Sequence, residues 1–159
     1  MAEADAVVET GAHLGPGFML WQVTNAWQRK SRAILASLGL TYVQVVLLSG
    51  LKHLSAEADS VSQASLALHL DADAMMTSQV LRTLETAGLV RRERNPRDQR
   101  AMILVVTAEG EARLARAIPM LADAEEQFFD PLGRREQRFL KSLRKLWRRG
   151  VREREKKEA

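Results

Sequence analysis

The sequence predicts a mainly α-helical fold with one small β-hairpin, arranged as a winged helix-turn-helix domain between N- and C-terminal helices. Residues 62–87 carry two short helical patterns that are separated by a tight turn. An arginine-rich turn around Pro96 then lies between two short runs of strand-forming residues. Two helices followed at once by such a hairpin indicate a winged helix-turn-helix.

The first two helices have identifiable ends. Residues 15–17 can begin a helix whose apolar side chains recur at helical spacing until Gly39 ends it. Thr41 is a candidate N-cap for a second helix through about residue 54. This second helix is mostly apolar, and we therefore expect it to be buried.

The helix-turn-helix and its hairpin follow. Ser60 or Ser62 is expected to open a short helix to about residue 68, and Asp73 is placed to cap the next helix, residues 74–87. Gly88 can end that helix, because glycine readily adopts the left-handed conformation. Residues 89–94 and 102–106 are predicted strands. Thr107 is expected to cap a long helix, and a break at residues 131–133 precedes a last helix from 134 to about 154.

These patterns predict one domain with extensions. The expected parts, in chain order, are a disordered segment 1–13, an N-terminal dimerisation helix 14–40, a winged helix-turn-helix domain 41–107, C-terminal dimerisation helices 108–154 and a tail 155–159.

Composition excludes several classes of protein. The chain contains no cysteine, which excludes disulfides, thiolate metal sites and cysteine redox sensing. No apolar run approaches the roughly 20 residues that a membrane helix needs, and residues 1–9 lack the features of a signal peptide, so we expect a cytoplasmic protein. We find no glycine-rich phosphate loop, nucleophile elbow or paired catalytic constellation, and no cofactor is expected. An enzyme is therefore not predicted.

Positive charge is concentrated at the C-terminal end. Residues 131–159 hold 12 Lys and Arg against 4 Asp and Glu, whereas residues 1–130 hold 12 against 16. A basic run can bind nucleic acid, but more often it is the solvated face of a helix. Apolar residues at helical spacing favour the second interpretation for most of this tail, and whether the tail contacts DNA stays open.

Both terminal helices carry more apolar surface than the small central domain can cover. Phe18, Trp21 and Trp27 lie in the first of them, and Phe139 and Trp147 in the last. Exposed apolar stripes usually indicate a partner. A homodimer is the economical hypothesis, because two-fold symmetry suits a helix-turn-helix protein that binds a palindromic site.

The chain resembles the MarR family of transcriptional regulators from about Gly17 to Leu146. Five segments carry the resemblance: Gly17-Phe18-Met19-Leu20, Leu38-Gly39-Leu40-Thr41, residues 81–90, the wing Asn95-Pro96-Arg97-Asp98-Gln99-Arg100-Ala101, and Val105-Val106-Thr107-Ala108-Glu109-Gly110. The wing is the most specific. The resemblance implies a homodimer on double-stranded DNA, at a pseudo-palindromic operator near its own promoter, and often release by a small aromatic or amphipathic inducer. Two departures stand out: residues 74–79 hold no arginine, and the cysteine of the peroxide-sensing branch is missing.

The second helix of the helix-turn-helix is the predicted recognition helix. Glutamine can bond adenine bidentately, and hydroxyl groups can reach bases or phosphates. Four side chains are expected to project from its first turns toward DNA: Thr77, Ser78, Gln79 and Arg82. Met75 and Met76 are interpreted as packing residues, with a methyl contact to thymine as the alternative.

The wing is predicted to reach DNA through arginines. Arg100 resembles the wing-tip arginine of the family, which enters the minor groove, and Asp98 resembles the residue that orients the wing through an ion pair. Arg94 and Arg97 are expected to contact phosphates, which set affinity without reading sequence.

Two further groups of residues are candidates for a metal site and for a ligand cavity. His69, Asp71 and Asp73 alternate, but zinc needs three or four converging ligands, and capping explains Asp73, so no metal is predicted. A ligand cavity is one interpretation of four other residues, since such cavities are mainly apolar with a few polar groups; core or dimer interface is the alternative. They are Met19, Trp21, Trp27 and His53.

The leading hypothesis is a sequence-specific DNA-binding regulator, a homodimeric repressor relieved by a small aromatic or amphipathic ligand. The alternative is a winged helix that binds protein without binding DNA. The arginine-rich wing favours DNA.

Overall fold

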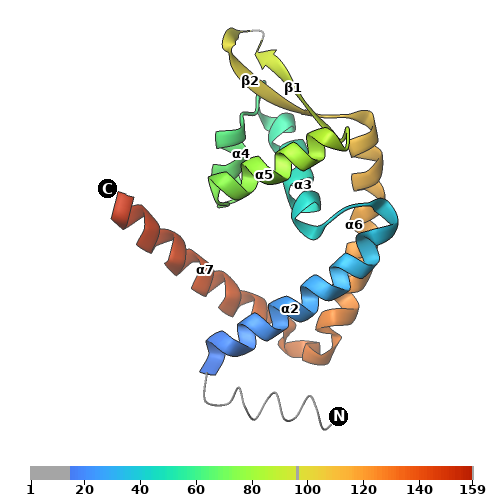
Figure 1. Cartoon of the computed structure of the whole chain (residues 1–159). Coiled ribbons are helices and arrows are strands. Elements are labelled where there is room, and N and C mark those ends of the chain that lie inside the picture. The colour runs from blue at the N-terminus through green and yellow to red at the C-terminus, as the bar shows by residue number, and fades with distance from the viewer. Residues whose placement is uncertain (1–14, 96, 159) are drawn as a thin grey trace.

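The chain folds into a helical body from which a two-stranded hairpin and one long helix project (Figure 1). This computed structural model describes residues 15–95 and 97–158, so the expected disordered segment 1–13 lies outside the described residues. The elements are, in chain order, α2 (Gly15–Leu35), η1 (Ala36–Leu38), α3 (Tyr42–Glu57), α4 (Gln63–His69), α5 (Ala74–Thr86), β1 (Val90–Asn95), β2 (Asp98–Val106), α6 (Ala108–Phe129), η2 (Asp130–Arg135) and α7 (Glu136–Glu158). The predicted mainly helical fold with a hairpin wing and terminal helices is confirmed.

Four helices begin at the capping residues that the sequence predicts. The side chains of Thr41 and Ser62 each accept a hydrogen bond from the backbone three residues later, in capping boxes. Asp73 accepts from the backbone N–H of Met76 at 2.8 Å, and Thr107 accepts from that of Gly110 at 3.0 Å. These bonds satisfy backbone donors that have no partner within the helix, and so they fix where each helix starts.

The core lies among α3, α4, α5 and the start of α6, and most of its members are leucines. Leu48 and Leu51 of α3 and Leu81 and Leu84 of α5 are fully buried. Each buried leucine contributes roughly 1.5–3 kcal/mol of transfer free energy. The core therefore holds the helix-turn-helix as one unit against α6. Its other buried leucines are Leu35, Leu38, Leu40, Leu47, Leu66, Leu89, Leu104 and Leu114.

The hairpin is antiparallel and pairs Val90 with Val106 at its base and Asn95 with Asp98 at its tip. An irregularity in the register follows Arg94. The N–H of Leu104 also donates to the carbonyl of Val61 at 2.8 Å, so the segment before α4 is bonded to β2. The wing is thus anchored at its base, while its tip extends beyond the helices (Figure 1).

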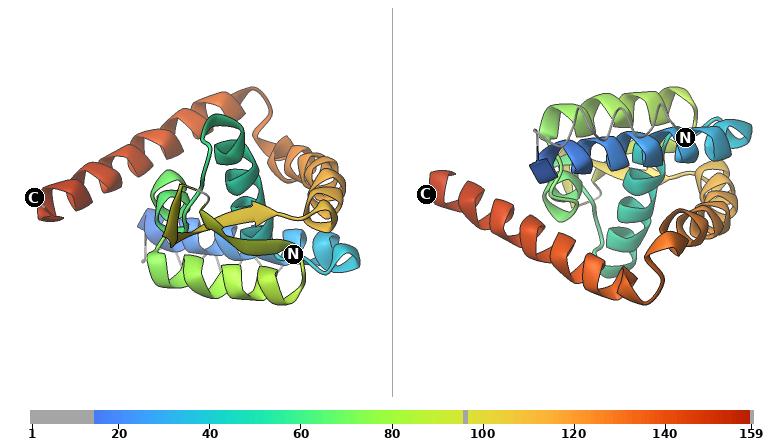
Figure 2. Two further views of the ribbon diagram at one scale, coloured as in Figure 1. Left: turned by 90° about the horizontal axis from the view of Figure 1, so that it is seen from above. Right: turned by 90° about the horizontal axis from the view of Figure 1, so that it is seen from below.

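Helix α7 runs as an arm away from the body (Figure 2). It begins at Glu136 and continues to Glu158, so most of the tail predicted at 155–159 is helical. Halfway along, the indole N–H of Trp147 donates to a carboxylate oxygen of Asp71 at 2.9 Å, in the turn between α4 and α5. The arm therefore touches the helix-turn-helix.

No single helix of the described residues is long and apolar enough to cross a membrane. By length and composition alone, one bent pair passes that test together, Gly15–Leu38 with Tyr42–Glu57, at an angle of 71°.

Candidate nucleic-acid interface and ligand cavity

The recognition helix α5 presents part of the predicted set of side chains to solvent. Gln79 and Arg82 are exposed and Ser78 is half-buried. Thr77 is fully buried, and its hydroxyl donates to the carbonyl of Asp73 at 2.8 Å. The prediction that Thr77 projects toward DNA is therefore wrong, because this residue lies on the face of α5 that packs against the core. Its hydroxyl bonds to the backbone of the preceding helical turn instead.

The two methionines at the start of α5 differ. Met76 is half-buried, as its interpretation as a packing residue predicts. Met75 is 83% exposed, and the packing interpretation is wrong for it. It lies one helical turn before Ser78 and Gln79, on the face that they share.

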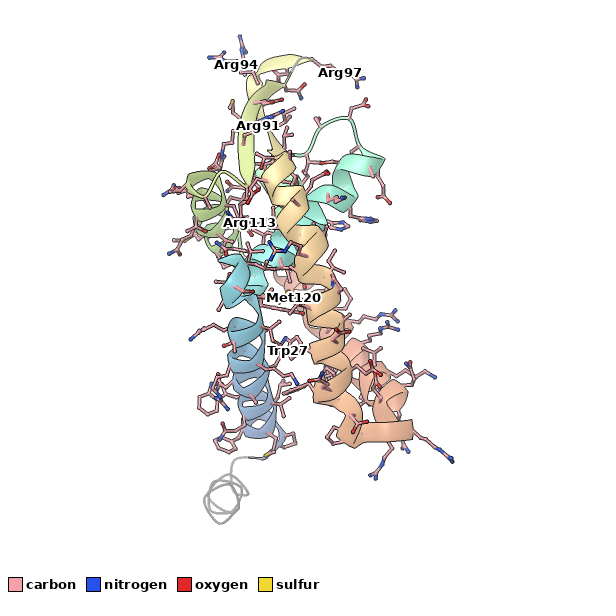
Figure 3. The ribbon with its side chains drawn as sticks, turned by 90° about the vertical axis from the view of Figure 1, so that its right-hand side faces the viewer. Trp27, Arg91, Arg94, Arg97, Arg113 and Met120 are labelled. Carbon is pink, nitrogen blue, oxygen red and sulfur yellow. The ribbon has the colours of Figure 1, made fainter. Side chains whose placement is uncertain are left out.

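Arg94 and Arg97 lie at the tip of the wing (Figure 3). Arg94, Arg97 and Arg100 are exposed. The guanidinium of Arg97 lies 2.6 Å from a carboxylate oxygen of Asp59, which precedes α4. A cationic hairpin of this kind can contact the phosphate backbone of DNA or enter its minor groove.

Asp98 shapes the wing through the backbone. Its carboxylate accepts a hydrogen bond from the backbone N–H of Arg100 at 3.0 Å. The side-chain oxygen of Asn95 accepts in the same way from the N–H of Arg97 at 2.8 Å. This backbone bond fixes the turn. The ion pair through which Asp98 was expected to orient the wing stays a prediction.

The structure adds positioning residues that sequence reasoning missed. Arg92 of β1 donates through Nε to Glu85 of α5 at 2.8 Å and through Nη2 to Gln63 of α4 at 3.1 Å. Gln44 of α3 donates to the hydroxyl of Thr83 on α5 at 3.0 Å. These bonds fix the recognition helix relative to the wing and to α3. A single glutamine or arginine in a charged stretch offers no sequence signal of such a role, because the partners are 7 to 39 residues away.

The base of the wing is locked onto the start of α6. The hydroxyl of Thr107 donates to the carbonyl of Gly88 at 2.7 Å, and its N–H donates to the carbonyl of Leu89 at 3.0 Å. Gly110 packs against the same carbonyl so closely that an added Cβ would lie 2.2 Å from the oxygen of Leu89. The helix start in the family resemblance, Thr107 followed by Gly110, therefore has a structural reason.

A second anchor joins α6 to the corner between α2 and α3. Arg113 donates to the carbonyl of Leu38 at 3.3 Å and pairs with Glu109 at 2.7 Å (Figure 3). Leu38 lies where the chain leaves the N-terminal helix and enters the helix-turn-helix. The corner is thus held by a charge-assisted bond to a carbonyl at a helix end.

A cavity of about 490 Å³ lies between α2 and α6 on one side and α3 and α4 on the other. Trp27 of α2 and Tyr42 of α3 meet edge to face, with ring centroids 5.5 Å apart. His53 of α3 and His69 of α4 stack at 5.4 Å on another part of the wall. Such a mainly apolar space with a few polar groups suits a small aromatic molecule. The remaining walls come from Val45, Val46, Ser49, Gly50, Leu70, Ile118, Leu121, Ala122 and Glu125.

The phenol of Tyr42 is held in its neutral form at this cavity. Burial raises its pKa above the ordinary value of 10.0, and the negative charge of Glu125 raises it further. A hydrogen bond with Trp27 acts in the opposite direction. Tyr42 therefore offers a hydroxyl, not a phenolate, to a molecule in the cavity.

The four residues predicted to line one cavity do not meet. Trp27 and His53 line it, and Trp27 lies between α2 and α6 together with Met120 (Figure 3). Met19 instead lines an apolar groove of about 670 Å³ between α2 and α7. Trp21 is 58% exposed and contacts the ring of Phe18. The prediction is wrong for Met19 and Trp21, because they lie one or two turns nearer the free end of α2 than Trp27.

The alternating His69, Asp71 and Asp73 serve three separate contacts. His69 stacks on His53, Asp71 accepts from Trp147, and Asp73 caps α5. In the described part of the chain, no three or more histidine, aspartate and glutamate side chains gather as a group that could hold a metal ion.

Comparison with known proteins gives the family. Residues 40–102 match the MarR family model. The HTH-type transcriptional regulator YdcH of Bacillus subtilis (strain 168) is 39% identical over 137 residues, which are 86% of this chain and 92% of that protein. The HTH-type transcriptional repressor Rv2887 of Mycobacterium tuberculosis is 31% identical over 82% of this chain and 91% of its own length.

Two solved structures are similar in fold and sequence. The transcriptional repressor CouR bound to a 23-mer DNA duplex superposes with a TM-score of 0.69 at 28% identity, over 84% of this chain and 92% of that one. Rv2887 in complex with p-aminosalicylic acid superposes with a TM-score of 0.60 at 28% identity, over 82% and 97%. The family model and these full-length relatives, transcriptional regulators and not enzymes, show the family: the chain belongs to the MarR family of DNA-binding transcriptional regulators.

Proposed function

We propose that the protein is a homodimeric repressor that binds a pseudo-palindromic operator and is released by a small aromatic ligand. The observation that carries the DNA-binding part is the pairing of an exposed polar face on α5 with an exposed arginine wing. Gln79 and Arg82 supply base-edge and phosphate contacts, with half-buried Ser78 between them. The repressor CouR, similar in fold, was solved on duplex DNA.

The wing contributes charge. Arg94, Arg97 and Arg100 supply phosphate and minor-groove contacts, and Asp98 holds the turn that presents Arg100. Arg97 exchanges its exposed ion pair with Asp59 for a phosphate, at little cost, because exposed ion pairs contribute about 0–1 kcal/mol.

A second copy of the chain covers the terminal helices. Leu20 and Trp21 of α2 and Leu146 and Trp147 of α7 are between 50% and 63% exposed. The groove between α2 and α7 is almost wholly apolar in its lining, which comes from Pro16, Gly17, Met19, Leu20 and Val23 and from Phe139 and Leu146. Burying this surface in a symmetric contact sets the two recognition helices at a fixed spacing. Residues 15–38 and 108–158 thus form the dimerisation part, and residues 41–107 form the DNA-binding domain.

The ligand site is the cavity lined by Trp27 and His53. Two aromatic rings supply stacking surface, and the histidine pair supplies groups that can donate to a carboxylate or phenol. Rv2887, a similar repressor, was solved with p-aminosalicylic acid. Because the walls come from α2 and α6 on one side and from α3 and α4 on the other, a ligand there binds the DNA-competent and released arrangements with different affinity.

The experiment has two readouts on the full chain. Selection from a random duplex library should enrich one pseudo-palindrome, and p-aminosalicylic acid should release the fluorescent duplex in an anisotropy titration. The variant Trp27→Leu should keep duplex affinity and lose release, whereas Leu68→Ala, outside both the cavity and the dimer surface, should keep both. Failure to enrich any sequence contradicts the repressor proposal. Equal release of both variants contradicts the cavity.

A further inference from the structure

One apolar side chain stands on the surface of the recognition helix without a packing role. Met75 is the second residue of α5 and is 83% exposed, although methionine is a residue that folding normally buries. Its neighbour Met76 is half-buried, and the fully buried Leu81 and Leu84 supply the core side of the same helix. Met75 therefore contributes almost nothing to the fold.

Its position places it among the residues that face DNA. Helical spacing aligns residues three, four and seven apart, so Met75 lies on the face of Ser78, Gln79 and Arg82. It stands in the first turn of the helix, two residues after the cap Asp73. In a helix-turn-helix, the N-terminal residues of the recognition helix contact base edges.

We propose that Met75 reads the sequence by packing its thioether methyl group against the C5-methyl group of thymine, and this assignment rests on the proposed DNA-binding function. The thymine methyl is the only apolar group that a base presents in the major groove, and an unbranched thioether can adapt to it. An exposed methionine carries no charge and offers at most a weak acceptor, so phosphate contact is excluded for it. The pair Gln79 and Met75 then recognises an adenine and a nearby thymine by two different chemistries.

A chemical substitution in the DNA tests this contact without disturbing the protein. The probe is the duplex selected from the random library, in which each thymine is replaced in turn by deoxyuridine, which lacks only the methyl group. For the wild-type chain, one symmetric pair of replacements should weaken binding by about fourfold per half-site, the value of one buried methyl group. Hydrogen bonds to that base pair stay intact.

Two variants complete the test. Met75→Ala should lose the same factor on the thymine duplex and bind the thymine and deoxyuridine duplexes equally. Leu68→Ala is the matched control, because Leu68 of α4 is also 83% exposed but lies outside the recognition helix. It should keep the full wild-type sensitivity to deoxyuridine. Both changes remove exposed apolar atoms from helices and raise helix propensity, so folding is preserved.

The outcomes separate the proposals. Wild-type binding that is insensitive to deoxyuridine at every position overturns the Met75 assignment, as does Met75→Ala with undiminished sensitivity. Either result, on a duplex that the protein has selected, leaves the DNA-binding function standing. A library from which no sequence is enriched overturns both.

Discussion

Arg92 of β1 and Glu85 of α5 form an ion pair, Nε to Oε1 2.8 Å, that ties the wing to the recognition helix. Their side chains are only 30% and 26% exposed, so water screens the pair less than the other ion pairs of the wing. The same guanidinium reaches Gln63 of α4 at 3.1 Å. One side chain therefore joins all three elements of the winged helix-turn-helix.

Arg92→Gln should lower the free energy of unfolding by about 1–2 kcal/mol, the range of partly screened hydrogen bonds to charged groups. Urea denaturation measures it, and a double-mutant cycle with Glu85→Gln should give a coupling of about 0.5–1 kcal/mol. Arg91→Gln is the control, because its pair with Glu93 is more exposed and should contribute less than about 0.5 kcal/mol. Equal stability of the two arginine variants would contradict the positioning role.

Gly110→Ala should destabilise the protein by about 1–3 kcal/mol, the usual cost of overpacking. The added Cβ would lie 2.2 Å from the carbonyl oxygen of Leu89, and backbone must shift to admit it. Gly150→Ala is the matched change, since nothing lies within 4 Å of its Cβ position and alanine favours a helix. The melting temperatures of both variants test this prediction. A Gly110→Ala protein with the melting temperature of the wild type would contradict the close contact.

Three substitutions distinguish the contributions of charge, wing geometry and base recognition to DNA binding. They change Arg100, Asp98 and Gln79, respectively. Arg100→Ala should cost about 1–3 kcal/mol of operator affinity and lower the salt slope by about one. Asp98→Ala should weaken binding indirectly, by freeing the backbone bond to the N–H of Arg100. Gln79→Ala should relax preference at one base pair with the salt slope nearly unchanged. Titrations at several salt concentrations measure all three, and three variants that match the wild type would show that this surface does not touch DNA.

The phenol of Tyr42 should titrate above pH 10, because its pKa is raised. Tyrosinate absorbance measures this titration directly, because Tyr42 is the single tyrosine of the chain. The folded protein then holds a proton that the unfolded chain has lost. The stability that this linkage contributes is therefore complete below about pH 10 and falls as the pH rises through the raised pKa. Glu125→Gln should move the titration downward, since it removes the nearby negative charge. An unchanged titration in that variant would argue against the Coulomb effect.

Much of the fold could be predicted because local chemistry encodes it. Thr41, Ser62, Asp73 and Thr107 cap the helices that the sequence assigned to them, and Gly88 ends α5 with a φ of 71°. Capping depends on residues three apart, and a single sequence contains that information. The hairpin could also be predicted from local sequence, because its turn residues and arginines lie between two short strand-forming runs.

The errors concern which way a side chain points and which distant residues meet. Thr77 and Met75 are two residues apart on one helix, and packing on α3 and α4 decided that the polar one is buried and the apolar one exposed. Likewise, Trp27 and His53 line the cavity, whereas Met19 lines the groove between α2 and α7. Which part of α2 packs against α3 and α6 is decided by tertiary contacts, and helical periodicity alone does not indicate it. The bond between Trp147 and Asp71 joins residues 76 positions apart, and no local pattern indicates it.

In the proposed complex, two symmetry-related α5 helices bind successive major grooves of one operator. The most direct measurement is affinity for the selected duplex before and after insertion of about 5 base pairs at its dyad, which turns one half-site by roughly half a helical turn. The full-length dimer should lose most of its specific affinity on the expanded duplex and regain part of it when about 10 base pairs are inserted. Affinity that is unchanged by the 5-base-pair insertion would contradict the symmetric mode of binding.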